Sequence, residues 1–194
     1  MKFKKFLLLL SLCTFLACTN NLIPSEKTMP SETIKLKKEL NEISGLAWVS
    51  DDLIACVQDE KAHVYYLNPA TGKIVDSYDF GHNGDFEGIA VKDNKTFILR
   101  SDGHILISKK KKKAKEYKFK NGKDFDFEGL CLDALNNRLL VACKEHGKKD
   151  KNKKVYIFSF SLDEKEYEKD PVFVLSRKHL GSNFKPSGIA MHEN

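Results

Sequence analysis

Glu42-Ile-Ser-Gly-Leu-Ala47 is a short motif that recurs as Asp85-Phe-Glu-Gly-Ile-Ala90, Asp126-Phe-Glu-Gly-Leu-Cys131 and Lys185-Pro-Ser-Gly-Ile-Ala190. The four glycines are separated by 43, 41 and 59 residues. Self-similarity at this period is typical of a β-propeller or another repeat array. In each copy a polar residue precedes the glycine, and an apolar run with a small residue follows it. The motif therefore predicts the start of a crowded inner strand, where glycine lets another backbone come close.

Three further runs follow each of the first three glycines, rich in the β-branched and aromatic residues that favour strands. We expect second strands at 53–59, 96–102 and 139–145, third strands at 63–67, 104–107 and 154–158, and fourth strands at 73–80, 115–120 and 171–175. Four short antiparallel strands in about 40–45 residues form one propeller blade. The sequence thus predicts an all-β fold, a partial β-propeller over 41–194, with blades at about 41–80, 84–120 and 126–176 and the start of a fourth at 185–194.

Residues 1–17 have the pattern of an export signal, with a basic start, Met1-Lys-Phe-Lys-Lys5, and an apolar run too short to span a bilayer comfortably. The segment Leu16-Ala17-Cys18 resembles the lipobox of bacterial lipoproteins, which predicts a lipidated Cys18. The alternative is an ordinary signal peptide with a cysteine by chance. Residues 18–40 are polar and contain Pro24 and Pro30, so we expect a flexible tether. The chain is then lipid-anchored to a membrane of the bacterial cell envelope.

The charge balance gives no argument for nucleic acid. Removing residues 1–17 takes away three lysines and no acid, so the net charge falls from +6 to +3. Two basic runs, 109–115 and 148–154, flank third strands and are expected as solvated loops, with weak adhesion to anionic lipid or polysaccharide as the alternative. Neither run has interleaved aromatic residues or a recognition helix, so we predict no nucleic-acid partner.

The cysteines and histidines show no metal-ligand spacing. Cys56 and Cys143 lie within apolar second strands, and Cys131 takes the small-residue place that alanine holds in the other motifs. We expect these three as small buried apolar residues. The six histidines are expected to be structural or exposed.

Acidic residues align in two columns of the repeat. The first holds Glu87 and Glu128 before the glycine, with Glu42 displaced by two residues and Ser187 in the fourth copy. The second, at the ends of the second strands, holds Asp59, Asp102 and Glu145. In an antiparallel hairpin these two places share an edge, so both columns are expected at the mouth of the central channel.

A ring of carboxylates suits Ca²⁺, which takes six to eight oxygen ligands. The predicted metal ligands are Glu42, Asp59, Glu87, Asp102 and Glu128. The alternative is that each acid accepts backbone hydrogen bonds at a blade junction or pairs with a neighbour such as Arg100 or Lys144.

Five segments together resemble the SdiA-regulated family, also called YjiK-like, over residues 36–194: 42–46, 84–90, 126–133, 141–145 and 185–190. The resemblance implies a six-bladed β-propeller in the bacterial envelope that binds calcium and has no established reaction. The positions that match its polar motifs, Glu87, Glu128, Lys144 and Glu145, are the expected ligand-binding residues.

The length departs from that family, because six blades need about 260 residues and 154 follow residue 40. The chain is therefore expected to be a fragment or a truncated product. An open propeller leaves strand edges unpaired, so we predict self-association.

The sequence favours a non-enzymatic module that binds an envelope ligand or partner at the acidic mouth. The alternative is a calcium-dependent hydrolase, lactonase-like or phytase-like, whose site is incomplete here. It would use a metal to polarise a carbonyl or phosphoryl oxygen. Against it, the sequence has no Gly-x-Ser-x-Gly segment and no histidine placed beside the acidic columns as an evident base. A third hypothesis is a scaffold whose acids are all paired internally.

Overall fold

The computed structural model describes residues 32–109, 112–120, 125–146, 153–181 and 184–192. One folded unit spans Ile34–Asn194. The predicted signal segment and Cys18 lie outside the described residues. No helix in the described part of the chain is long and apolar enough to cross a membrane.

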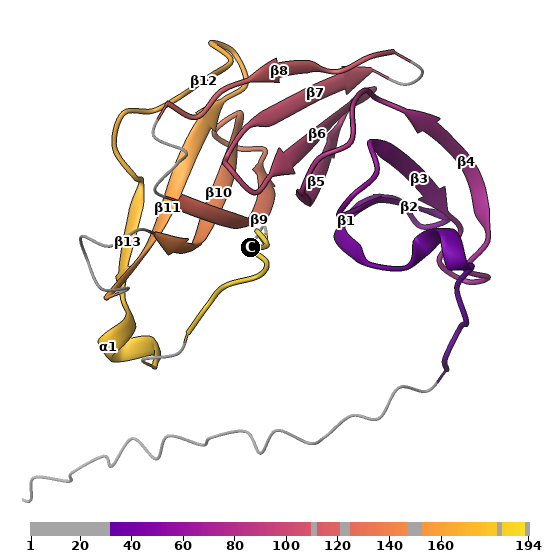
Figure 1. Cartoon of the computed structure of the whole chain (residues 1–194), viewed down its shortest axis with the longest axis horizontal. Helices are drawn as coiled ribbons and strands as arrows, with labels where there is room; N and C mark the ends of the chain where they lie inside the picture. Colours follow the sequence, from indigo (N-terminus) through magenta and orange to yellow (C-terminus); the bar gives the residue numbers. More distant parts are fainter. Residues whose placement is uncertain (1–31, 110–111, 121–124, 147–152, 182–183, 193–194) are drawn as a thin grey trace, which may run out of the picture. The chain divides into compact units, whose positions relative to one another are not determined.

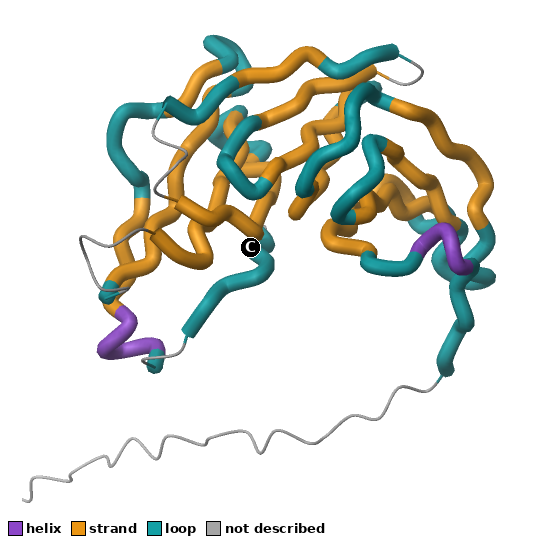
Figure 2. Tube along the Cα trace, viewed as in Figure 1, coloured by secondary structure: helices purple, strands orange, loops and turns teal. Residues whose placement is uncertain are grey.

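Almost all regular structure is β-strand, in three antiparallel sheets that follow one another along the chain (Figures 1 and 2). The first sheet has the order β1 (Ile43–Ser50), β2 (Leu53–Gln58), β3 (His63–Leu67) and β4 (Ile74–Asp79). The second has the order β5 (Phe86–Lys92), β6 (Lys95–Arg100), β7 (Ile105–Lys109) and β8 (Lys115–Tyr117). Sequential antiparallel pairing of four strands is the blade of a β-propeller. The predicted fold class is confirmed.

The third sheet pairs β9 (Phe125–Asp133), β10 (Arg138–His146) and β11 (Lys154–Ser161), and its fourth strand is divided in two. β12 (Glu166–Tyr167) pairs with one end of β11, and β13 (Phe173–Ser176) pairs with the other. The strand expected at 171–175 corresponds to β13. Two short helical turns complete the described structure, η1 (Lys38–Leu40) and α1 (Arg177–Leu180).

The motif glycines bring the inner strands of successive blades into contact. A Cβ added at Gly45 of β1 would lie 2.8 Å from the Cα of Gly88 in β5. A Cβ at Gly88 would lie 2.8 Å from the Cβ of Leu130 in β9, and one at Gly129 would lie 3.3 Å from the carbonyl carbon of Gly188. The separations of 2.8 Å are shorter than a side chain tolerates, so those two contacts require glycine, and a Cβ at Gly129 would force its neighbour to shift by a few tenths of an ångström. The expectation that the motif marks close backbone approach is confirmed.

Two apolar clusters fill the spaces between neighbouring blades. The cluster between the first and second blades includes Val57, Phe80, Phe86 and Ile98. The cluster between the second and third is more aromatic and includes Phe119, Phe127, Phe158 and Phe160. Burial of each such side chain contributes about 1.5–3 kcal/mol, so these clusters join the blades into one body.

The three described cysteines are reduced and buried. Burial raises the pKa of the Cys56 and Cys131 thiols to about 11 and that of the Cys143 thiol to about 12. They are therefore neutral at physiological pH and behave as small apolar residues, as the sequence predicts.

Residues 34–40 were expected in the tether, but they belong to the folded unit. Leu40 is buried with Cys56, Tyr65 and Leu67 on the face of the first blade opposite to the face that packs against the second blade. The side chain of Ile34 lies against Gly72, where an added Cβ would approach Ile34 Cγ2 to 2.6 Å. Apolar side chains interspersed in a polar segment thus cover a face that would otherwise meet water.

Candidate functional site

The starts of the inner strands meet the ends of the preceding second strands through the backbone. Phe86 N–H donates to the Asp59 carbonyl at 2.7 Å, and Phe127 N–H donates to the Ser101 carbonyl at 2.9 Å. These equivalent bonds make Ser101 the counterpart of Asp59. The expected column of Asp59, Asp102 and Glu145 is therefore out of register, and Asp102 lies one residue beyond the junction.

A small pocket of about 100 Å³ opens among the inner strands, lined by residues of all four motifs. Its polar lining consists of Glu87, Glu128, Ser44 and Ser187, which occupy the same position of the motif, directly before the glycine. The glycines beside them leave the space. The structure thus brings together Glu87, Glu128 and Ser187 of the first predicted column, and it places Ser44 there in the first motif instead of Glu42.

The two glutamates of this acidic pocket are in different electrostatic states. The ammonium of Lys144 donates to Glu128 Oε1, and this bond raises the pKa of Lys144. Burial, a hydrogen bond with Asp85 and the negative charges of Asp85, Glu128 and Asp126 raise the pKa of Glu87 to about 7. Glu87 is therefore partly protonated at neutral pH, whereas Glu128 forms an ion pair with Lys144.

Asp126 extends the acidic group along β9. Burial and the charge of Glu128 raise its pKa, and Lys144 opposes the rise. Within the pocket lining, the Oγ of Ser44 is buried and has no hydrogen-bond partner among the described residues. A buried polar atom without a partner is costly, so this oxygen is available to a bound ligand.

The other predicted site residues lie apart from the pocket lining. Glu145 pairs with Lys185 of the fourth motif, and that ion pair lowers its pKa. Glu42 is exposed, has φ of 60°, and its carbonyl accepts the Asp59 N–H at 3.2 Å. Asp59 has a buried Oδ1 without a hydrogen-bond partner in the described structure.

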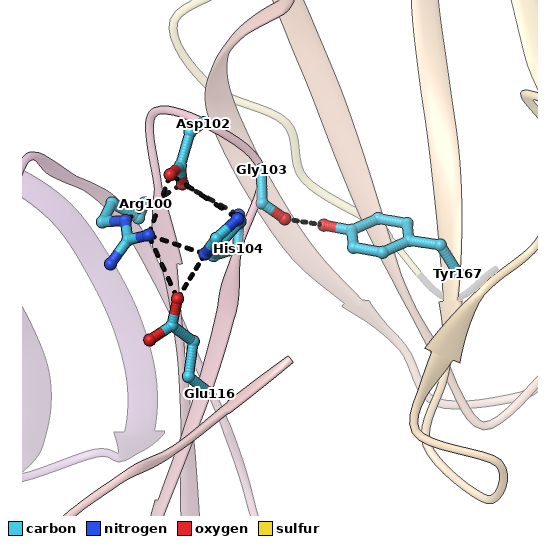
Figure 3. Close-up of polar contacts among 6 residues, drawn as sticks. All are labelled: Arg100, Asp102, Gly103, His104, Glu116 and Tyr167. Atoms are coloured by element: carbon cyan, nitrogen blue, oxygen red, sulfur yellow. Dashed lines mark hydrogen bonds and ion pairs between the residues drawn. The ribbon is translucent and has the colours of Figure 1, made fainter. Parts of the chain in front are cut away.

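Asp102 belongs to a separate polar cluster on the second blade, shown in Figure 3. The Arg100 guanidinium donates to both carboxylate oxygens of Asp102, at 3.0 and 2.8 Å, and to Glu116 at 3.1 Å. His104 pairs with Glu116 and lies beside Arg100. Burial opposes ionisation of Asp102, but hydrogen bonds from Arg100 and the His104 N–H hold its pKa below the ordinary value.

This cluster answers one alternative that the sequence left open. Asp102 pairs with a neighbouring arginine, as that alternative proposes, and does not join Glu87 and Glu128. Next to it, the hydroxyl of Tyr167 donates to the Gly103 carbonyl at 2.6 Å and joins the third blade to the second (Figure 3). Sequence reasoning missed His104 and Glu116, because Glu116 reaches the cluster from the neighbouring strand β8.

The five predicted calcium ligands are not assembled. Among the residues that the structure describes, no three acidic, histidine or cysteine side chains gather in a way that could hold a metal ion. Only Glu87 and Glu128 of the five line the acidic pocket. The ring of carboxylates expected at the channel mouth is therefore reduced to one pair with two serines.

Comparison with known proteins shows similarity in fold alone. The chain superimposes on the computationally designed Ika4 protein with a TM-score of 0.51 and 14% identity, covering 86% of this chain and 89% of Ika4. For the designed Ika8 protein the values are 0.50 and 13%, over 83% of this chain and 43% of Ika8. The Cps50 (Swd1) β-propeller domain of Myceliophteria thermophila gives 0.45 and 10%, over 69% of this chain and 41% of that domain.

The chain thus spans about two fifths of the length of the Ika8 and Cps50 structures. No family model matches the sequence, and no curated protein matches it.

Proposed function

We propose that this chain is a non-enzymatic binding module of the bacterial cell envelope, of the SdiA-regulated type, that binds a cationic group in the acidic pocket. The main observation in favour of the proposal is that Glu87 and Glu128 line the same pocket, next to a Ser44 Oγ that has no hydrogen-bond partner among the described residues. Four acidic side chains lie close together at this end of the inner strands: Asp85, Glu87, Asp126 and Glu128. Lys144 forms an ion pair with Glu128. A second positive charge would offset the burial and the carboxylate repulsion that together raise the pKa of Glu87.

The size of the pocket limits what enters it. A water molecule occupies about 30 Å³ of liquid volume, so about 100 Å³ admits a small ion with a few waters or the ammonium end of a larger ligand. Carboxylate and hydroxyl oxygens are the donors that Ca²⁺ prefers. Glu87, Glu128, Ser44 and Ser187 would hold the ion, with water completing its coordination.

Thermal unfolding with and without millimolar Ca²⁺ tests this proposal, with a diamine such as cadaverine as the organic cation. A ligand at a hundredfold excess over its Kd adds about 2.7 kcal/mol, which raises the Tm by a few degrees. We expect the rise to disappear in Glu87→Gln and Glu128→Gln. The matched control is Glu164→Gln, because Glu164 is exposed and does not line the pocket.

The outcomes separate the two sources of positive charge. A shift with Ca²⁺ alone identifies a metal site, and a shift with the diamine alone identifies an organic cation. If neither ligand changes the Tm, or if Glu164→Gln removes the effect as well, the acidic pocket is not a cation site.

Lipid anchoring through Cys18 is the second part of the proposal and rests on the Leu16-Ala17-Cys18 sequence. Mass spectrometry of the exported chain is expected to show a diacylglyceryl-modified Cys18 at the N-terminus. Cys18→Ala is expected to release the protein from the membrane fraction. An unmodified mature N-terminus would contradict the anchor.

A hydrolase is a second candidate, and the pKa of Glu87 near 7 favours it, because a general acid or base works best with a pKa close to the working pH. In that role Glu87 would exchange a proton with a substrate at the pocket. Assays with lactone, aryl-ester and phosphomonoester substrates test the hypothesis. Turnover that is lost in Glu87→Gln supports it, and no turnover of any of the three classes excludes it for this chain.

A further inference from the structure

A second and larger pocket lies between the second and third blades, where β5 and β9 end. Its volume is about 540 Å³, within the range of about 300–1,000 Å³ that small-molecule sites occupy. It opens among three hairpin connections, β5–β6, β9–β10 and β11–β12, together with the facing ends of β7 and β8. The acidic pocket lies at the opposite end of β5.

Lysines dominate the polar lining of this basic pocket: Lys92, Lys95, Lys109, Lys115 and Lys165. Two aspartates, Asp93 and Asp163, accompany them and leave an excess of three positive charges. In the described structure, none of the five ammonium groups is paired with a carboxylate. Positive charge gathered in a concave surface raises the local concentration of anions.

One side of the pocket is held in place by hydrogen bonds. The Lys92 ammonium donates to Asn137 Oδ1 at 2.5 Å, and the Asn137 amide donates to Asp163 Oδ1 at 2.7 Å. The Asp163 carboxylate is therefore engaged by the Asn137 amide and not by a lysine in the described structure. The chain Lys92–Asn137–Asp163 links the second blade to the third across the pocket and keeps one lysine pre-positioned.

The rest of the lining is apolar and supports the body of a ligand. Phe97, Ile107 and Leu162 form part of this wall. The Lys115 ammonium lies over the ring of Tyr117, 5.2 Å from the ring centroid. An apolar wall with a few charged groups at its edge is typical of a site for a charged organic molecule.

The lysines come from distant parts of the sequence, since Lys92 and Lys165 are 73 residues apart. Solvated lysines on a surface spread apart, because like charges repel. Here the fold gathers them around a cavity. Lysine ammonium is a compact point charge that suits phosphate oxygens.

We propose that the basic pocket binds a phosphate-bearing organic anion with two or more negative charges. The phosphate groups lie beside the pre-positioned Lys92, among Lys95, Lys109, Lys115 and Lys165, and the uncharged body lies on the apolar wall. The phosphate can belong to a soluble molecule or to a lipid head group, because both present the same oxygens to the lysines. This ligand is separate from the cation proposed for the acidic pocket.

Isothermal titration of the full chain with tripolyphosphate, and sedimentation with phosphatidylcholine vesicles that do or do not contain phosphatidic acid, test this site. The variant is Lys95→Gln/Lys115→Gln/Lys165→Gln. The control, Lys37→Gln/Lys61→Gln/Lys73→Gln, makes the same change of net charge at exposed lysines outside the pocket. Unfolding curves of both variants check that each is folded.

We expect the pocket variant to bind at least about tenfold more weakly and the control to stay within about twofold of the wild type. Binding to tripolyphosphate identifies a soluble ligand, and binding only to vesicles with phosphatidic acid identifies a head group. Equal weakening in both variants would show attraction by net charge alone and overturn the proposal. Binding of neither probe to the wild type would overturn it as well.

Discussion

The two ends of strand β5 border pockets of opposite charge. The pocket at the start of the strand is small and tightly packed, and the pocket at its end is larger and more open. At its start, glycine contacts leave an acidic pocket of about 100 Å³ among the inner strands. At its end, hairpin turns surround a basic pocket of about 540 Å³. Glu87 at the acidic pocket and Lys92 at the basic pocket are five residues apart on this extended strand, roughly 17 Å. This exceeds the Debye length of about 8 Å at physiological salt, so the two pockets respond to their own ligands independently.

The comparison of the two pockets shows that tight packing determines which charged side chains need an ion-pair partner within the protein. At the acidic end the backbones are in contact and the carboxylates cannot move apart, so Lys144 is built in to neutralise Glu128. At the basic end the lysines have long stems and open space, and they tolerate their neighbours without built-in acids. The following substitutions test this contrast, from the largest expected effect to the smallest.

The largest effect is expected from Gly45→Ala at the acidic end. The new Cβ would lie 2.8 Å from Gly88 Cα and from the Ile89 nitrogen, which are backbone atoms that cannot turn away. We expect a loss of about 3 kcal/mol in the free energy of unfolding, measured by urea denaturation. Gly188→Ala is the control, because a Cβ added there would meet nothing within 4 Å. Equal losses in the two variants would contradict the tight packing of the inner strands.

A smaller loss is expected from Lys144→Ala, about 1–2 kcal/mol, because Glu128 would lose its ion-pair partner and stay next to Asp126. Lys165→Ala at the basic end is the comparison. Lys165 is exposed and has no carboxylate partner in the described structure, so its removal is expected to change stability by less than about 0.5 kcal/mol. Denaturation of both variants in the same buffer measures the contrast. If Lys165→Ala costs as much, the two ends do not differ.

The smallest effect depends on pH and comes from Glu87→Gln. The folded pKa of Glu87, about 7, lies above the ordinary value of 4.5, so the folded state binds the proton more tightly than the unfolded state. Glu87 therefore costs stability as pH rises from about 4.5 to 7, and the full cost is present above 7. Glutamine cannot ionise, so the variant is expected to be more stable than the wild type at about pH 8, by about 1 kcal/mol after allowing for solvent screening.

Glu128→Gln is the matched control for that substitution, because the same chemical change removes the partner of Lys144. It is expected to lower stability where Glu87→Gln raises it. Melting curves of the two variants across the pH range measure both signs. A stabilising Glu128→Gln would mean that the lysine does not neutralise that carboxylate.

The fold was predictable from sequence because each repeat carries its own local signals. The Gly motif marks the inner strand, and β-branched and aromatic runs mark the strands that follow. Glu87 and Glu128 could be paired in advance because both stand directly before a motif glycine. Glycine itself fixes the side on which the next backbone lies, so the acidic pocket could be placed as well.

The register of the second strands could not be predicted in the same way. The sequence alignment matched Asp59 with Asp102 and Glu145, whereas Val57, Leu99 and Ala142 all face a motif glycine. The apolar runs of the second strands have similar lengths, so an alignment shifted by one residue matches them equally well. Bulges between Phe86 and Gly88 and between Cys143 and Glu145 shift the pairing further. Side-chain direction changes with each such step, so Asp102 turns to Arg100 instead of the pocket.

The basic pocket escaped prediction for another reason. The sequence shows Lys109 to Lys115 as a solvated run, and nothing in it connects these lysines with Lys92 or Lys165. They meet because hairpin turns of two blades stand next to each other. A site of this kind leaves no motif in the sequence, so it can be recognised only when the arrangement of the blades is known.

The contacts between motif glycines also bear on how such a chain can change its length. Gly45 lies against the second repeat, Gly88 lies against the third, and Gly129 reaches the fourth motif. Each repeat therefore depends on its immediate neighbours, as in other repeat arrays. Duplication of a complete repeat preserves every glycine contact, whereas insertion of half a repeat would place a side chain where a glycine is required. The unit that evolution can copy or delete is thus a whole blade, and the number of blades can change while the acidic and basic ends keep their places.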